Sequence, residues 1–258
     1  MENHQFINHW TSPDEIRFYK TPLGTLRSVT SYLKVLAKPA LITWAANTTA
    51  EYVKDKLIDI KEGRLDIGAM DIKEIVRAAK QHHKEKFEAG GKRGTDIHHA
   101  INEYWATGIM PDETIKENKE TTILFQSFLK WQKDCQIMPI SYEQTVYSKH
   151  GYAGTLDLFA EVNECPQHIE MPWPLGAYVI DYKTGKAIYG EAKMQATAYL
   201  YALQEREPPV KCKGIMIVRF YPGDYEIEVY GRHICRHLFT AFLHLVGYVN
   251  TLTLLGYS

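Results

Sequence analysis

The segment from Val179 to Gly185 reads Val-Ile-Asp-Tyr-Lys-Thr-Gly and carries a carboxylate and an ammonium two residues apart. In a β-strand alternate side chains share a face, so Asp181 and Lys183 are predicted to point the same way. Val179 shares their face and Ile180 lies on the other, which predicts a strand that is apolar on both sides and central in its sheet. Charged side chains at the end of a buried strand require partners or a function.

A second carboxylate, Asp157, lies among apolar neighbours in the strand-like segment Gly-Thr-Leu-Asp-Leu-Phe at 154–159. If this strand pairs with that of Asp181 across a loop at 164–176, the two carboxylates lie side by side. Adjacent carboxylates repel each other unless a cation lies between them. Oxygen-rich sites of this kind suit Mg²⁺ or Mn²⁺.

His98 is the third candidate. It lies three residues before Ile101 and seven before Trp105, so on a helix it borders the apolar stripe instead of facing water. From that margin an imidazole nitrogen can reach a metal ion held by the two aspartates. Gln195 and Tyr199, four residues apart, share one helix face, where an amide can bond a phosphate or a base and a phenol ring can stack.

Each of these residues also has an ordinary structural interpretation. An Asp-x-Lys pair on a strand is most often a solvated pair at a sheet edge, and Asp157 can serve as a turn cap. A histidine on a helix margin is more often structural than a ligand, and Gln195 and Tyr199 are common helix-surface residues. The order of the four segments favours chemistry: a helix with His, a strand with Gly-x-x-Asp, a strand with Asp-x-Lys and a helix with Gln-x-x-x-Tyr.

The spacing of apolar residues predicts the elements that must position these side chains. Helices are expected from Pro39 towards Leu57, from Asp71 to Phe87 with a stop at Gly90 and Gly91, from a cap at Thr95 through Trp105, and over 118–133, 191–203 and 233–255. Strands are expected over 141–147, 154–162, 177–182, 214–221 and 224–230, with a hairpin turn at 221–224. This order predicts an α/β sandwich around a central mixed sheet, preceded by a largely helical stretch over 28–88.

The chain has 258 residues, enough for one large domain or for one domain with a helical extension. Its 30 basic and 31 acidic side chains give a net charge of −1, which argues mildly against a nucleic-acid partner. An enzyme needs only a local positive groove, however. The basic residues near the candidate site, which are more often solvated helix surface, are Lys80, Lys84, Lys86, Lys92, Arg93, Lys183, Lys186 and Lys193.

No apolar segment is long enough to span a bilayer, and the first ten residues lack a signal-peptide core. We therefore expect a cytoplasmic protein with no membrane partner. Cys135, Cys165, Cys212 and Cys235 are far apart and form no CxxC pair, so free thiols are expected.

The four motifs in this order resemble the RecB-like branch of the PD-(D/E)XK nucleases. The matching segments are GTDIHHAI (94–101), GTLDLF (154–159), VIDYKTGK (179–186) and QATAY (195–199). The opening SVTSYLKVLAKPALITWAA (28–46) is similar to the N-terminal helical region of small phage exonucleases and, more loosely, of mitochondrial genome maintenance exonucleases. One departure is Arg27, where the pattern has a proline. Some relatives hold an iron–sulfur cluster by one early and three late cysteines, and because that spacing is absent here we expect no cluster.

The resemblance implies a restriction-endonuclease-like fold, with a helical region over 1–90 packed on a nuclease core over 91–258. It implies that one or two Mg²⁺ or Mn²⁺ ions are bound by His98, Asp157, Asp181 and the backbone carbonyl of Tyr182. Lys183 would orient a water molecule or stabilise the developing negative charge. The implied DNA contacts are Gln195, Tyr199, Thr184, Lys186, Lys92, Arg93, Ser28 and Thr30, and for the last two simple helix capping is the favoured alternative.

The activity implied by the resemblance is a metal-dependent DNA exonuclease with Asp157, Asp181 and Lys183 as its catalytic residues. Such an enzyme would serve phage DNA replication, recombination or repair in the cytoplasm of a bacterial host, on single-stranded DNA or an end with a single-stranded tail. Three alternatives stay open: a structure-specific endonuclease with the same chemistry, a non-catalytic DNA-binding module on the same fold, and an unrelated α/β protein whose motifs match by chance.

Overall fold

A computed structural model describes residues 9–13, 15–36, 38–65, 72–111, 118–166 and 172–257. The chain divides into two compact units, one formed by Met1–Leu36 with Asp96–Ser258 and the other by Ala37–Thr95. This division differs from the one expected at residue 90, because the elements before Leu36 belong with the larger unit and not with the helical one.

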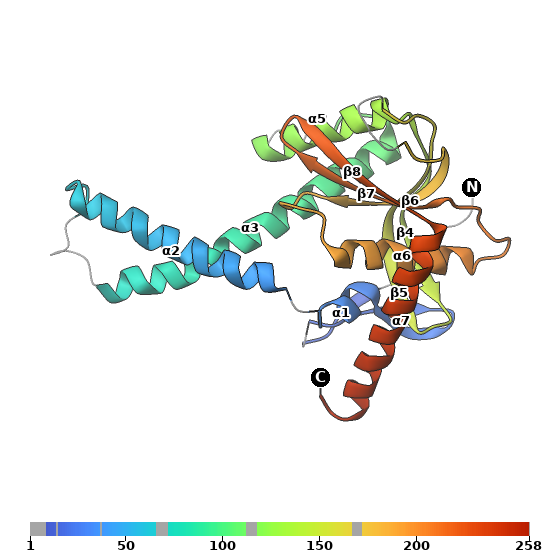
Figure 1. Cartoon of the computed structure of the whole chain (residues 1–258), viewed down its shortest axis with the longest axis horizontal. Coiled ribbons are helices and arrows are strands. Elements are labelled where there is room, and N and C mark those ends of the chain that lie inside the picture. The colour runs from blue at the N-terminus through green and yellow to red at the C-terminus, as the bar shows by residue number, and fades with distance from the viewer. Residues whose placement is uncertain are drawn as a thin grey trace. The chain divides into compact units, whose positions relative to one another are not determined.

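The larger unit is built on an open, mixed, eight-stranded sheet (Figure 1). Its strands are β1 (His9–Thr11), β2 (Arg17–Thr21), β3 (Gly24–Ser28), β4 (Ile137–Ser148), β5 (Tyr152–Val162), β6 (Gly176–Lys183), β7 (Gly214–Tyr221) and β8 (Asp224–Gly231). They lie in the order β1-β2-β3-β5-β6-β7-β8, and β4 pairs with β5 as well. The β3–β5 and β6–β7 pairs are parallel, and the other pairs are antiparallel. The predicted central mixed sheet is thus confirmed.

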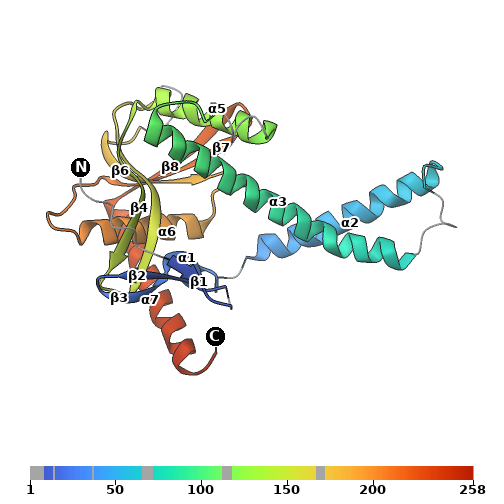
Figure 2. The ribbon, with the colours of Figure 1, turned by 180° about the vertical axis from the view of Figure 1, so that it is seen from behind.

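Helices cover both faces of this sheet, as Figure 1 and the opposite view in Figure 2 show. They are α1 (Val29–Leu33), α5 (Lys119–Asp134), α6 (Gly190–Gln204), α7 (Arg232–Leu254) and the last part of α3 (Ile72–Thr107). One apolar cluster joins α3 and α5 to the sheet through Ile101, Phe125 and Trp131. A second cluster joins α1, α6 and α7 to it through side chains such as Leu200 and Phe242. Burial on both faces explains the nearly continuous apolar runs of β6 and β7.

The smaller unit is a pair of helices, α2 (Pro39–Lys61) and the first part of α3. Pro39 stands in the first turn of α2, where its missing N–H costs nothing, as the sequence predicts. The two helices contact each other through Tyr52 and His82, whose ring centroids lie 4.8 Å apart. None of the helices in the described ranges is both long and apolar enough to cross a membrane.

Two boundary predictions around Gly90 were wrong. The helix does not stop at Gly90 and Gly91, because α3 continues through both to Thr107. Thr95 is not an N-cap either, since its hydroxyl lies inside α3 and donates to the carbonyl of Gly91 at 3.2 Å. A glycine costs only about 1 kcal/mol in a helix interior, and the apolar stripe that follows outweighs that cost.

The first three strands were not predicted. All of β1 is exposed, and β2 and β3 contribute little to the core apart from Tyr19, which is 2% exposed. Short strands of this kind are stabilised by pairing with neighbours more than by their own apolar pattern. The remaining strands and helices agree with the predicted ones, with shifts at their ends, and β6 lies between β5 and β7 as expected for a central strand.

Gly154 of β5 allows α6 to pack closely on the sheet. A Cβ atom at this position would lie 2.3 Å from Cε1 and 2.9 Å from Cζ of the Tyr199 ring. The ring is buried and cannot move aside without disturbing its neighbours.

We therefore expect Gly154→Ala to lower the free energy of unfolding by about 1–3 kcal/mol, as overpacking does, in urea denaturation. Gly190→Ala is the matched control, because a Cβ there meets nothing within 4 Å. Equal unfolding midpoints for the two variants would contradict the packing argument.

Candidate active site

The candidate site lies where two strands part. One edge of β5 pairs with β3 at Tyr152 and Ala153 and with β6 over Leu158–Val162. Between these stretches, residues 154–157 pair with neither strand along this edge. Asp157 comes directly before the paired stretch, and Asp181 is the next residue of β6 after Ile180, the partner of Leu158. The backbone N–H of Tyr182 donates to Asp157 Oδ2 at 2.8 Å. The two aspartates that sequence analysis selected therefore occupy adjacent positions on neighbouring strands.

His98 reaches this point from α3. Its Nδ1 lies 3.4 Å from Asp157 Oδ1, and its Nε2 lies 3.2 Å from the carbonyl oxygen of Tyr182. Both ring nitrogens thus face acceptor oxygens, which is the arrangement of the doubly protonated imidazolium. Burial alone would lower the pKa of His98, but the Asp157 carboxylate outweighs it and raises the pKa above its ordinary value.

Asp157 is held in its charged form. Burial opposes ionisation, yet the attraction and hydrogen bond of His98, the charge of Lys183 and the N–H of Tyr182 together hold the pKa of Asp157 below its ordinary value. His98 and Asp157 therefore form an ion pair in which each partner stabilises the charge of the other.

The pKa of Asp181 is shifted in the opposite direction. Asp181 is 2% exposed, and burial together with the neighbouring Asp157 raises its pKa to about 6, although Lys183 opposes the shift. Lys183 Nζ lies 2.5 Å from Asp181 Oδ2, but that oxygen receives no well-directed hydrogen bond from the described residues. Burial disfavours the charge of Lys183, but Asp181 and Asp157 outweigh it and raise the lysine pKa. The site thus holds two acids, each of which lies beside one cation of the chain.

The donor types fit a hard divalent cation, because two carboxylates and the Tyr182 carbonyl present oxygen atoms in one place. In the described ranges no group of three or more His, Cys, Asp and Glu side chains is arranged to hold a metal ion as it stands. The oxygens are taken up instead by two cations of the chain itself, the imidazolium of His98 and the ammonium of Lys183. The residues that would hold an ion are His98, Asp157, Asp181 and the Tyr182 carbonyl, and an ion would replace at least part of those contacts.

Gln195 and Tyr199 lie on one face of α6, as their spacing predicts. Gln195 Nε2 donates to the Tyr199 hydroxyl at 3.2 Å. Tyr199 is only 3% exposed and its ring packs on Gly154, so the ring is not free to stack on a nucleic-acid base. This corrects the stacking role expected for Tyr199, whereas Gln195 is only half-buried and keeps part of its surface exposed.

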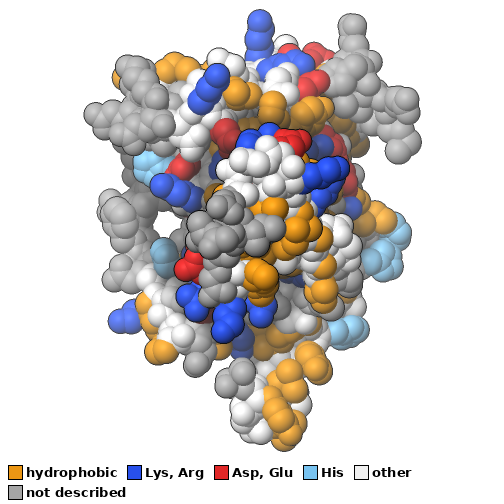
Figure 3. Space-filling view, turned by 90° about the vertical axis from the view of Figure 1, so that its left-hand side faces the viewer, with side chains coloured by type: hydrophobic (Ala, Val, Ile, Leu, Met, Phe, Trp, Pro, Cys, Tyr) orange, Lys and Arg blue, Asp and Glu red, His pale blue; other side chains and the backbone are white. Residues whose placement is uncertain are grey.

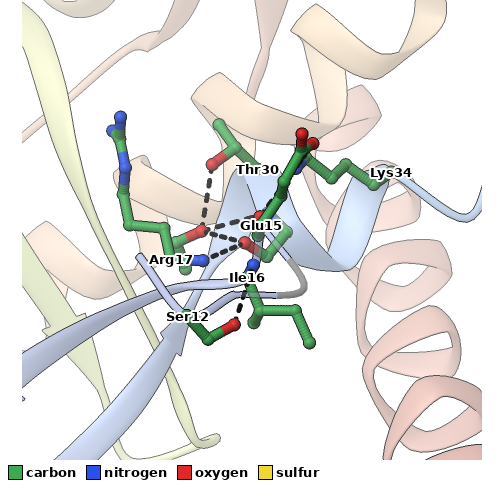
Figure 4. Close-up of polar contacts among 8 residues, drawn as sticks. Ser12, Glu15, Ile16, Arg17, Thr30 and Lys34 are labelled. Atoms are coloured by element: carbon green, nitrogen blue, oxygen red, sulfur yellow. Dashed lines mark hydrogen bonds and ion pairs between the residues drawn. The ribbon is translucent and has the colours of Figure 1, made fainter. Parts of the chain in front are cut away.

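Ser28 and Thr30 are engaged in capping. Ser28 is the N-cap of α1, where its Oγ accepts from the N–H of Ser31 at 3.0 Å and lies 3.0 Å from the hydroxyl of Thr30. The Ser31 hydroxyl in turn accepts the N–H of Arg17 at 2.9 Å, which ties α1 to β2. Figure 4 shows Arg17 of β2 beside Thr30 of α1. Ser28 is 1% exposed. This placement favours the capping interpretation over a phosphate contact.

The other expected DNA contacts are spread over both units. Thr184 is half-buried and Lys186 exposed directly after β6, whereas Lys92 and Arg93 lie on α3 within the helical unit. Charged side chains of both signs lie among hydrophobic ones on the face shown in Figure 3, in keeping with the net charge of −1. The DNA contacts of these four residues stay predictions.

All four cysteines are free, as expected from their spacing, and Cys135 and Cys235 are buried.

Sequence reasoning missed three polar residues that join α3 and β4 to the site. Asn102 Nδ2 donates to Glu143 Oε1 at 2.6 Å, and Trp105 Nε1 donates to the Tyr182 hydroxyl at 3.2 Å. Asn102 and Trp105 follow His98 by four and seven residues, so their shared face was readable from the spacing. Nothing in the sequence around Glu143 pointed to it.

No model of a known protein family matches the chain, and no curated protein matches it either. The resemblance to the RecB-like nucleases therefore depends on the four sequence motifs.

The raised pKa of Asp181 leads to a prediction about stability. Between the ordinary value of 3.8 and the folded-state value of about 6, the folded chain keeps a proton that the unfolded chain releases. Wild-type stability contributed by this group is therefore lost as the pH rises through that window. Asparagine cannot ionise, so the free energy of unfolding of Asp181→Asn should rise relative to that of wild type between about pH 4 and pH 7, by at most about 3 kcal/mol.

The measurement is urea denaturation of both proteins in the presence of EDTA. Loss of the ion pair with Lys183 offsets part of the gain at the higher pH. A free-energy difference between the two proteins that does not change with pH would contradict the assigned shift.

Proposed function

We propose that the protein is a Mg²⁺- or Mn²⁺-dependent DNA nuclease, with an exonuclease favoured. One observation carries the proposal: three segments far apart in sequence bring His98, Asp157, Asp181 and Lys183 to one place. Buried carboxylates that repel each other beside a lysine are costly for a fold, and such arrangements cluster at functional sites. The four motifs supply the reaction class through their resemblance to the RecB-like nucleases.

The proposed roles follow from the contacts of each side chain. Asp157, Asp181, His98 and the Tyr182 carbonyl would hold the ion, which when bound supplies an activated water and neutralises charge on the phosphate. Lys183 is 30% exposed at its side chain, so its ammonium can turn from Asp181 towards a phosphate oxygen and stabilise developing negative charge. His98 would give up one of its two protons when its nitrogen becomes a ligand.

The proposed substrate is single-stranded DNA or a DNA end with a single-stranded tail, and the proposed setting is the cytoplasm of a bacterium that expresses a phage replication, recombination or repair module. Gln195, Thr184 and Lys186 are the residues of the larger unit that would contact the substrate. A structure-specific endonuclease with the same catalytic residues is the second candidate. A non-catalytic DNA-binding module is the third, although the retention of both aspartates and the lysine favours an enzyme.

Lys183→Met tests the catalytic proposal. Removal of a charge that stabilises the transition state should lower DNA cleavage by roughly 100-fold or more in Mg²⁺ or Mn²⁺. Lys130→Met is the matched control, because Lys130 forms only a surface ion pair, with Asp224 at 2.8 Å. This variant should cleave DNA at the wild-type rate. The proposal would be abandoned if purified, folded Lys183→Met cut labelled oligonucleotides at the wild-type rate, or if wild type still cut them after thorough chelation.

The topology of the substrate separates the two enzymatic candidates. An exonuclease requires an end, so covalently closed single-stranded circles should survive under conditions that degrade the same DNA after linearisation. Gel analysis of both forms over time is the measurement. Cleavage of the circles at a rate comparable with that of the linear form would favour the endonuclease.

A further inference from the structure

Glu143 has an unusual backbone conformation for a strand residue. Its φ is +45°, in the left-handed region that side chains other than glycine rarely adopt. It lies inside β4 between Tyr142, which pairs with Leu158, and Gln144, which pairs with Leu156. Glu143 therefore lies opposite Asp157 of β5, at a position where the regular pairing of the two strands is interrupted. Strain of this kind persists only where the surrounding structure maintains it, and it clusters at functional sites.

The other left-handed residues have local explanations. Among the described residues other than glycine, only Glu15 and Gln136 share this backbone region with Glu143. Gln136 directly follows the C-cap of α5, where helices commonly end in this conformation. Glu15 lies in the turn between β1 and β2. Glu143 is the one of the three that lies within a strand.

The carboxylate of Glu143 has a specific partner on α3. It accepts the amide of Asn102 at 2.6 Å, and Asn102 lies one turn after His98. His98, Asn102 and Trp105 share one helix face, and each bonds to a different group on the sheet. The last turns of α3 are thus bonded at three points to β4 and β6.

Glu143 also lies in the electrostatic field of the site. Partial burial and the neighbouring Asp157 raise its pKa, while the Asn102 hydrogen bond and the charges of His98 and Arg17 oppose the shift. Two neighbouring contacts thus join α3 to the sheet. Asn102 bonds to Glu143 on β4, and His98 bonds to Asp157 on β5.

We propose that Glu143 is a positioning residue of the candidate active site. Through Asn102 it fixes the turn of α3 that carries His98, so that the imidazole meets both Asp157 and the Tyr182 carbonyl. Its effect on cleavage rests on the proposed function, but its effect on His98 does not. What matters is the acceptor oxygen of Glu143, which a glutamine can supply and a glycine cannot.

Three variants test this. Glu143→Gln keeps an acceptor for Asn102, whereas Glu143→Gly removes it and relieves the left-handed backbone. Gln136→Gly is the matched control, because it makes the same backbone change at a helix end outside the site. The first readout is the side-chain ¹H–¹⁵N spectrum of the histidines, in which the His98 ring signals are assigned by their loss in His98→Gln. The second is kcat for DNA cleavage, and the third is the thermal midpoint.

We expect Glu143→Gly to shift the His98 ring signals and to lower kcat about 10- to 100-fold, the loss typical of residues that orient a metal ligand, with a midpoint close to that of wild type. Glu143→Gln should keep the wild-type signals and most of the activity, and Gln136→Gly should change neither.

Unchanged His98 signals in Glu143→Gly would overturn the inference, as would equal losses in Glu143→Gln and Glu143→Gly, since charge and not the acceptor would then matter. If wild type cuts no DNA but the His98 signals behave as expected, the proposed function fails and the positioning role stands.

Discussion

Repulsion between two neighbouring acids is the constraint on which the rest of the site depends. Asp157 and Asp181 lie next to each other on β5 and β6, where Asp181 is buried and Asp157 is partly buried. The two acids respond differently, because His98 lowers the pKa of Asp157 while burial raises the pKa of Asp181 to about 6. His98 of α3 and Lys183 of β6 therefore supply positive charge that offsets this repulsion.

Such a site is assembled before any ligand arrives. The oxygens that would bind a cation are already gathered, and what an ion must displace is a proton on His98 and the nearby ammonium of Lys183. Because those groups are part of the fold, little of the chain has to move when the charges are exchanged. If the site binds a cation as proposed, its affinity would depend on pH, because the cation would compete with protons on His98 and Asp181.

The central part of the molecule was predictable because its physics is local. Alternation placed Asp181 and Lys183 on one face, and their apolar neighbours marked β6 as a central strand with β5 beside it. Spacing on α3 likewise placed His98 beside Ile97 and Ile101, which are fully buried. The failures lie where distant contacts decide. The three strands up to Ser28 and the contact of Glu143 with Asn102 depend on neighbours that no short window of sequence contains. The helix through Gly90 and Gly91 was missed because two glycines were taken as a stop that their small cost does not enforce.

The distortions of β4 have a consequence for the molecule in solution. In the described part of the chain this twelve-residue strand pairs with β5 alone, so its second edge has no partner strand. A flat edge of that length is a template on which another chain can add a strand and begin aggregation. Three irregularities interrupt this edge. Pro139 lacks an N–H, the register shifts between Pro139 and Ser141, and Glu143 has a left-handed backbone conformation. The irregular edge therefore offers only short runs of hydrogen-bonding groups, which disfavours the addition of a strand from another chain.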